Sequence, residues 1–340
     1  MRSLEALRRL PKAELHVHLD GSLRPGTLID LAHRAGVALP SSDPDTIRRF
    51  MAVRRVRDLE EYLARFTLTV AVLQTPEALE RVAWEMVQDA ARDGVRYLEV
   101  RYCPTLSQGG GLAIDEVLAA QMRGLTRGSA DFGVTAAIIN CTLRHLPPEV
   151  SVEIARASAA WLGRGVVGFD IAGGEARFPA APHAAAFAVA RNGGLGITVH
   201  AGEAAGPESI REAVELCGAQ RLGHGTRLIR DPGLMAEVAA RGIAIEACLS
   251  SNAQTRAVER LGDHPVAAYL EAGIGVTLAT DNWLISDVAL SGEYDLAQRE
   301  LGLSDGQIDR LILNGFAAAF APAELKDQLL RQAREALAAA

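Results

Sequence analysis

Eight short apolar runs recur along this chain, and helical stretches separate them. The runs are rich in valine, isoleucine and leucine and cover residues 14–19, 95–102, 134–141, 166–172, 196–202, 221–225, 244–251 and 275–282. Patterns rich in alanine and charged residues, such as those over 76–94 and 233–242, lie between them. Short apolar strands that alternate with helices indicate a parallel sheet covered by helices on both faces.

Eight such units within 340 residues favour a closed (β/α)₈ barrel, the TIM barrel, over a doubly wound open sheet. The open-sheet alternative would need a glycine-rich phosphate loop after the first strand, and the sequence has none there. The chain shows no linker and no internal repeat. We therefore predict one barrel domain over residues 1–340.

Charge and hydropathy exclude several classes of partner. The formal net charge is −7 and the sequence contains no dense basic block, which argues against binding to nucleic acid or to an anionic membrane. No apolar run approaches the length of a membrane span, and the N-terminal segment lacks the pattern of a secretory signal. The four cysteines form no C-x-x-C pair, so we expect reduced thiols in a cytoplasmic protein.

The connection between the first two strands is unusually long and predicts a helical lid over about residues 22–92. Within it, the stretch 58–73 has helical periodicity, and one face of that helix carries Leu59, Tyr62, Leu63 and Phe66. This face could simply pack on the barrel. It could also cover the barrel mouth, because excursions of this length usually serve a site.

Polar side chains that could bind a metal or transfer protons gather where predicted strands end. In a strand, alternate residues share a face, so His16 and His18 point the same way. Further such residues follow the first, fifth, sixth and eighth strands: Asp20, His200, Glu203, His224, Asp281 and Asn282. Because barrel enzymes carry their chemistry at the carboxyl ends of the strands, these side chains are expected on one rim. Each motif alone is equally compatible with a structural role.

Four of these side chains offer three imidazole nitrogens and one carboxylate oxygen: His16, His18, His200 and Asp281. This ligand set suits Zn²⁺. Glu203 and His224 remain beside it and could activate water and transfer protons. A second metal would need a bridging residue after the fourth strand, where Gly173 and Gly174 stand instead. One metal ion is therefore favoured.

Several segments together closely resemble the adenosine deaminase family. They are "PKAELHVHLDGS", "LEVRYCP", "RHLPP", "VHAGE", "RLGHGTR" and "TLATDN", which occur in the family's order over essentially the full chain. The resemblance implies a barrel with one zinc ion per chain that hydrolyses the 6-amino group of an adenine nucleoside. The H-x-E and P-C-x-x-C signature of the nucleobase deaminases is absent from the sequence.

The resemblance also implies roles for individual residues. His16, His18, His200 and Asp281 would bind zinc. Glu203 would give a proton to N1 of the purine. His224 would orient and help to deprotonate the attacking water and then stabilise the developing oxyanion.

Substrate contacts follow from the same resemblance. Asp20 would accept a hydrogen bond from the ribose 5′-hydroxyl, Gly173 would present its backbone N–H to N3, and His18 would lie beside the substrate. The apolar face within 58–73 matches the family's hydrophobic gate. Asn282 stands where the family often has a second aspartate, next to the purine ring, so the preference for base and sugar stays open.

We therefore expect an enzyme that deaminates adenosine and 2′-deoxyadenosine to inosine and 2′-deoxyinosine, with release of ammonia. Within the same chemistry, adenine or 6-aminodeoxyfutalosine are alternative substrates. From another class, the chain could be an inactive zinc-bearing binding protein, although the presence of both Glu203 and His224 weighs against that. The sequence yields no prediction of oligomeric state.

Overall fold

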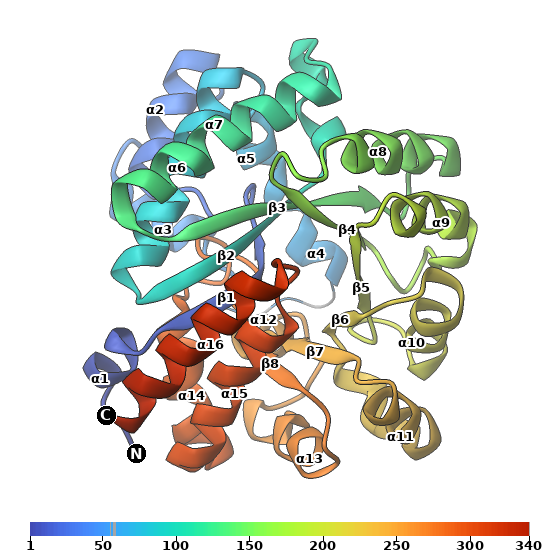
Figure 1. Cartoon of the computed structure of the whole chain (residues 1–340). Coiled ribbons are helices and arrows are strands. Elements are labelled where there is room, and N and C mark those ends of the chain that lie inside the picture. The colour runs from blue at the N-terminus through green and yellow to red at the C-terminus, as the bar shows by residue number, and fades with distance from the viewer. Residues whose placement is uncertain (55, 57–58, 340) are drawn as a thin grey trace.

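Eight parallel strands form one sheet in the order β1–β2–β3–β4–β5–β6–β7–β8, with each strand paired to the next (Figure 1). The computed structural model describes residues 1–54, 56 and 59–339. The strands are β1 (Lys12–His18), β2 (Val95–Tyr102), β3 (Thr135–Leu143), β4 (Val166–Ala172), β5 (Gly196–Ala201), β6 (Arg221–His224), β7 (Ala244–Ala247) and β8 (Val276–Leu278). The predicted (β/α)₈ barrel is confirmed.

The barrel closes between β8 and β1 through one residue just beyond β8. The backbone N–H of His18 donates to the carbonyl of Asp281 at 2.8 Å, and the N–H of Asp281 donates to the carbonyl of His16 at 2.8 Å. Val17 and Asp281 form an isolated parallel bridge at this seam. A predicted ligand residue therefore completes the ring of strands.

Helices surround the barrel and also form the long connection after β1 (Figure 1). That connection contains α2 (Pro25–Ala35), α3 (Pro44–Met51), α4 (Leu59–Leu63), α5 (Phe66–Val72) and α6 (Pro76–Arg92). The others are α1 (Leu4–Arg9), α7 (Ile114–Phe132), α8 (Pro148–Ala160), α9 (Ala184–Asn192), α10 (Pro207–Glu212), α11 (Pro232–Ala240), α12 (Leu249–Gln254), α13 (Val266–Glu271), α14 (Leu290–Leu301), α15 (Asp305–Ala318) and α16 (Ala323–Ala338).

Local sequence explains where several helices begin. Thr75 accepts the backbone N–H of Ala78 at the start of α6, and Pro76 follows it at the first helical position, where no amide hydrogen is needed. Ser304 and Gln307 form a capping box at the start of α15.

The barrel interior contains a network of buried ions instead of a purely apolar core. Arg101 donates to Asp170 at 2.7 Å and also contacts Glu246, and Arg221 lies 2.6 Å from Glu246 and 2.5 Å from Glu99. All five side chains are at most 1% exposed. Buried charges of this kind are tolerated only when they are paired, and this network lies directly beneath the predicted ligand residues.

Three predicted elements differ from the structure. The strand expected over 275–282 covers only Val276–Leu278. The strand expected over 244–251 ends at Ala247, and α12 begins at Leu249, because a short apolar run does not distinguish a strand from a buried helix. The single helix expected over 58–73 is instead α4 and α5, with a turn at 64–65 between them. Residue 58 lies outside the described residues. The Thr67 hydroxyl bonds the carbonyl of Ala64 at 3.1 Å in this turn, a local bond that competes with a continuous helix.

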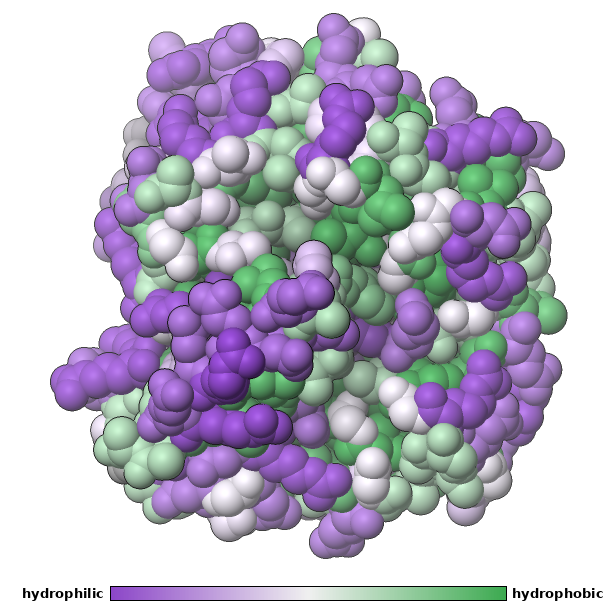
Figure 2. Space-filling view, in the orientation of Figure 1, coloured by the Kyte–Doolittle hydropathy of each residue, from purple (hydrophilic) through white to green (hydrophobic). Residues whose placement is uncertain are grey.

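Among the described residues, none of the helices is long and apolar enough to cross a membrane. The four cysteines are buried and unpaired. Figure 2 shows the molecule in the orientation of Figure 1, where hydrophilic side chains break the apolar surface into small areas.

Candidate functional site

A cavity of about 210 Å³ lies at the carboxyl ends of the strands and brings together the predicted site residues. Twelve of the predicted ligand, catalytic and substrate-contact residues line it: His18, Asp20, Leu59, Tyr62, Leu63, Phe66, Gly173, His200, Glu203, His224, Asp281 and Asn282. Of the predicted set, only His16 lies outside this lining, fully buried just beneath it.

The predicted ligand atoms converge on one point. Nε2 of His200 lies 3.0 Å from Nε2 of His16 and 3.2 Å from Nε2 of His18. Oδ1 of Asp281 lies 3.6 Å and 3.5 Å from the same two nitrogens. A tetrahedral zinc ion with bonds of roughly 2.0–2.1 Å needs ligand atoms about 3.3–3.4 Å apart. These four side chains therefore fit a metal ion of that size and coordination.

Two buried carboxylates orient the imidazoles. Glu246 Oε2 lies 3.0 Å from Nδ1 of His16, and Asp170 Oδ2 lies 2.9 Å from Nδ1 of His200. Carboxylates beside Nδ1 hold its proton there and leave a lone pair on Nε2. The two Nε2 lone pairs then face each other at 3.0 Å, and a cation between them removes their repulsion.

Burial also adjusts the charges of this cluster. It lowers the pKa of His16 to about 4 and lowers the pKa of His18 well below its ordinary value. For His200, burial opposes the charged form, but the Asp170 carboxylate outweighs it and raises the pKa. For Asp281, burial is likewise outweighed, here by the histidines, and the pKa falls. The cluster thus offers a cation an ionised carboxylate from Asp281 and neutral imidazoles from His16 and His18.

His224 also lies close to the point where the predicted ligand atoms converge. One ligand atom each of His16, His200, His224 and Asp281 lies within 4.8 Å of all the others. Nδ1 of His224, however, lies 2.9 Å from the side-chain nitrogen of Asn252. Its Nε2 lies 3.6 Å from Oε2 of Glu203. These contacts turn His224 toward Glu203 and the cavity.

Glu203 is 5% exposed and accepts a hydrogen bond from the Thr255 hydroxyl at 2.9 Å. Burial raises the pKa of its carboxyl, while the nearby His224 and Thr255 oppose the shift. A carboxyl group that keeps its proton toward neutral pH is suited to act as an acid.

Two of these residues have an uncommon backbone conformation. His224 and Asp281 have φ values of 65° and 64°, in the left-handed region that residues other than glycine rarely adopt. Such conformations cluster at functional sites, where the surrounding structure maintains them. Gly173 has φ of 101°, and a Cβ there would meet nothing closer than 3.7 Å. Glycine is therefore required at 173 by backbone conformation, and space is not the constraint.

The predicted gate residues all face the cavity from α4 and from the start of α5. The Tyr62 hydroxyl lies 2.7 Å from the Ser286 hydroxyl and accepts a hydrogen bond from the Asn282 amide at 3.0 Å. The other amide atom of Asn282, its oxygen, lies against Gly21, where a Cβ would come within 1.7 Å. These contacts join α4 to the loop after β8.

Known proteins resemble this chain over nearly its whole length. The family model described as adenosine deaminase matches residues 11–336. The chain belongs to the adenosine deaminase family. An adenosine deaminase of Mycobacterium avium is 40% identical over 341 residues, covering 94% of this chain and 93% of that protein.

Solved structures of similar proteins share the fold over nearly the whole chain. An adenine deaminase from Arthrobacter aurescens superposes with a TM-score of 0.88 at 26% identity, covering 96% of this chain and 98% of that one. An amidohydrolase from Burkholderia ambifaria with bound Zn has a TM-score of 0.88 at 25% identity, covering 99% of this chain and 95% of that one. A barrel of the same fold therefore carries zinc in a protein that is 25% identical to this chain.

Several site residues of this family member were missed by sequence reasoning. Asp170 and Glu246 lie within strands and were indistinguishable from other core carboxylates. Asn252 follows a strand that ends earlier than predicted. It also contacts His264, whose Nε2 lies 3.1 Å from the Asn252 amide oxygen. His145 lines the cavity, and its place in the "RHLPP" motif was the available signal.

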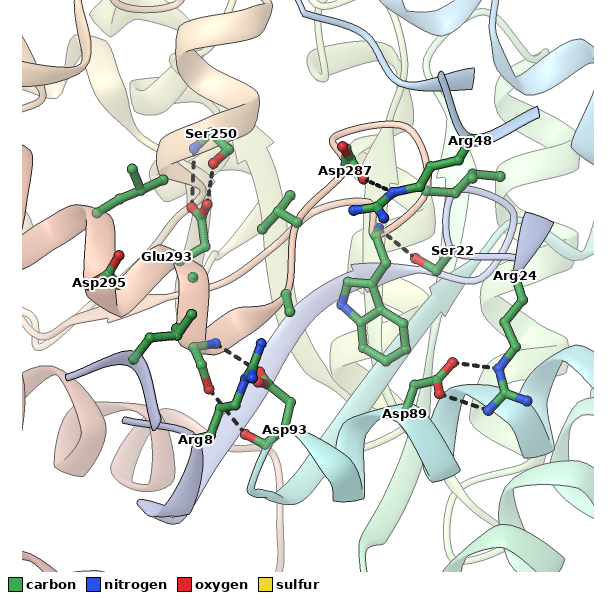
Figure 3. A pocket seen from close by; sticks show the side chains of 18 of the residues that line it. Arg8, Ser22, Arg24, Arg48, Asp89, Asp93, Ser250, Asp287, Glu293 and Asp295 are labelled. Atoms are coloured by element: carbon green, nitrogen blue, oxygen red, sulfur yellow. Dashed lines mark hydrogen bonds and ion pairs between the residues drawn. The ribbon is translucent and has the colours of Figure 1, made fainter. Parts of the chain in front are cut away.

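A larger, more open groove of about 550 Å³ lies beside the loop after β8 (Figure 3). Four of its charged side chains form two ion pairs. Arg24 bonds Asp89 at 2.7 Å, and Arg48 bonds Asp287 at 2.6 Å. The first pair lies within the connection after β1, and the second joins α3 to the loop after β8.

Proposed function

We propose that this protein is a zinc-dependent hydrolase that converts adenosine and 2′-deoxyadenosine to inosine and 2′-deoxyinosine with release of ammonia. The observation that carries the proposal is the pairing of Glu203 with His224 at 3.6 Å in the cavity, directly beside the converging histidines and carboxylate. This combination provides an acid, a polar group for water and a metal-binding set within one small space.

His16, His18, His200 and Asp281 would hold one zinc ion per chain. We place His18 in this set instead of His224 because Nδ1 and Nε2 of His224 already face Asn252 and Glu203. When bound, zinc supplies a Lewis acid that lowers the pKa of water.

Glu203 is proposed to give its proton to N1 of the purine, which makes C6 electrophilic. Water then adds its oxygen to C6, and the bond from C6 to the exocyclic nitrogen breaks. One proton of the water returns to the Glu203 carboxylate, and the other leaves with the nitrogen as ammonia. The product keeps the proton on N1 and a carbonyl at C6, so atoms and charges balance.

His224 is proposed to stabilise the oxygen that adds to C6. The Asn252 amide donates to Nδ1, so the neutral ring carries its proton on Nε2 and donates into the cavity. For His224 to take a proton from water, Nε2 would have to be unprotonated. The Asn252 amide would then be flipped, so that its oxygen accepts a hydrogen bond from Nδ1–H.

The cavity lining supports an uncharged sugar. Asp20 is 6% exposed and lines the cavity, and no lysine or arginine lines it in the part of the chain that the structure describes. A 5′-phosphate would therefore find a carboxyl group and no cation. We propose Asp20 as acceptor for the 5′-hydroxyl and Gly173 as donor to N3. The buried free thiols support a reducing, cytoplasmic location.

A panel of 6-aminopurines tests this proposal. Adenosine, 2′-deoxyadenosine, adenine, AMP and 6-aminodeoxyfutalosine are incubated with the zinc-loaded protein, and loss of the amino group is followed by absorbance. We expect the two nucleosides to be the best substrates by kcat/KM. A higher kcat/KM for adenine or for 6-aminodeoxyfutalosine would show that the nucleosides are not the preferred substrates. Zinc binding without turnover of any purine would support the inactive binding protein instead.

A further inference from the structure

The loop after β5, which carries Glu203, is organised around a single buried carboxylate from another loop. Four consecutive backbone N–H groups, those of residues 202–205, donate to the carboxylate of Glu175 at 2.6–3.0 Å. The Ser209 hydroxyl donates to it at 2.5 Å. Glu175 is 5% exposed and belongs to the segment after β4.

The opposite side of this loop is also fixed. The carbonyl of Gly202 accepts from the Thr226 hydroxyl at 2.6 Å and from the backbone N–H of Arg227 at 3.0 Å. Gly202 has φ of 76°, and a Cβ there would lie 2.5 Å from Cδ1 of Ile210. The loop is therefore held in a shape whose N–H groups converge. Converging amide hydrogens form an anion-binding concavity, and Glu175 fills it.

This arrangement connects two loops that line the cavity. Glu203 bonds Glu175 through its own backbone N–H at 3.0 Å, while its side chain reaches Thr255 and the cavity. Glu175 follows two residues after Gly173, which lines the same cavity. One carboxylate thus sets where the acid stands relative to the Gly173 turn.

We propose that Glu175 is a positioning residue, which holds the Glu203 loop and the Gly173 turn at the separation that deamination needs. The inference rests on the proposed function, in which Glu203 gives a proton to the purine. Displacing a proton donor by a fraction of an ångström weakens proton transfer strongly, whereas binding of the sugar and of the metal ion depends on other residues.

Charge is essential to this role. A carboxylate offers two acceptor oxygens and no donor, whereas a glutamine amide offers one oxygen and directs an NH₂ group at amide hydrogens. Glu175→Gln therefore keeps the side-chain volume but removes the match to the loop. The matched control is Glu212→Gln. Glu212 also accepts two backbone N–H groups, those of Ala180 and Ala181, at 3.1 and 3.2 Å, but it does not line the cavity.

The first experiment compares the steady-state kinetics of Glu175→Gln, Glu212→Gln and wild type on adenosine, with zinc content and melting temperature measured in parallel. For Glu175→Gln we expect kcat to fall about ten- to a hundredfold, the usual scale for losing hydrogen bonds to a charged group, with a smaller rise in KM, because Gly173 is the proposed donor to N3, and with zinc content nearly unchanged. Glu212→Gln is expected to keep the wild-type kcat.

The second experiment is chemical rescue of Glu175→Ala. Formate carries the same two oxygens and fits the space left by the side chain, so sodium formate is expected to restore part of kcat. Formamide and sodium chloride at the same concentration are the controls and are expected to restore none. A purely structural role for Glu175 would give no difference between formate and formamide.

Three results would overturn the inference. They are a wild-type kcat in Glu175→Gln, a loss of kcat that follows loss of zinc, and equal effects of the Glu175 and Glu212 substitutions. If Glu175→Ala does not fold, the comparison of kcat and KM in Glu175→Gln decides the question. Wild-type protein without activity on any purine would instead refute the proposed function, so the two failures are distinguishable.

Discussion

Removing a single oxygen from the lid tests whether α4 controls access to the cavity. The Tyr62 hydroxyl makes two hydrogen bonds, at 2.7 Å to Ser286 and 3.0 Å to Asn282, and the side chain is 1% exposed. Tyr62→Phe keeps the apolar ring and loses both bonds. Each neutral hydrogen bond contributes about 0.5–1.5 kcal/mol. If the two hydrogen bonds stabilise the closed position of α4, their loss of about 1–3 kcal/mol raises KM for adenosine by roughly 5–150-fold.

Tyr102→Phe is the matched control for this measurement. The Tyr102 hydroxyl lies 2.6 Å from the Ser107 hydroxyl and is fully buried, but Tyr102 does not line the cavity. We expect both variants to lose a few degrees of melting temperature at most, since about 1 kcal/mol shifts it by roughly 2–4 °C in chains of 150–250 residues. Only Tyr62→Phe should raise KM. Equal KM values in both variants would show that the α4 face only packs on the barrel.

Four further outcomes are expected. Metal analysis should find one zinc per chain, with activity lost on chelation and restored by Zn²⁺; two equivalents, or full activity without metal, would contradict the site. Glu203→Gln should keep zinc and lose about 10²–10⁴-fold in turnover, whereas loss of zinc would make Glu203 a ligand. Asn282 is expected to donate its amide N–H to N7 of the purine, so Asn282→Ala should cost about 1–3 kcal/mol in kcat/KM. A 7-deaza substrate, which lacks that acceptor, should be poor for wild type and lose little more in the variant; losses that simply add would mean that Asn282 does not contact N7. Burial raises the pKa of Glu293 to about 7, so ionising it costs stability as pH rises from about 4.5 to 7. Urea unfolding should therefore show Glu293→Gln gaining up to about 3 kcal/mol over wild type between pH 5 and pH 8, and an equal difference at both pH values would contradict this.

The fold and the chemical side chains were predictable because both follow from local patterns. Strands and helices alternate with their own periodicities, and the side chains of His16, His200 and Glu203 follow directly from strand ends. Barrel geometry then brings all strand ends to one rim, whatever the details of register.

The groups that orient those side chains were not predictable. Glu246 reaches His16 past β8, from β7 to β1, and this meeting depends on the tilt and stagger of these three strands. Glu175 is a similar case, because its partners are backbone amides, which leave no trace in side-chain patterns. The break between α4 and α5 was not predictable either, because the helical periodicity continues through it and the bond from Thr67 to the Ala64 carbonyl is visible only in the structure.

The seam between β1 and β8 has a consequence for the unfolded chain. His16 and His18 belong to the first strand, and Asp281 follows the last, so an ion that binds all three closes a loop of about 265 residues. In a disordered chain, closing a loop of that length costs about 5–6 kcal/mol in entropy. The unfolded polypeptide therefore cannot compete for the ion through this set of ligands. Almost all of the free energy of metal binding is then added to the free energy of unfolding, and the concentration of free metal sets how often the barrel opens.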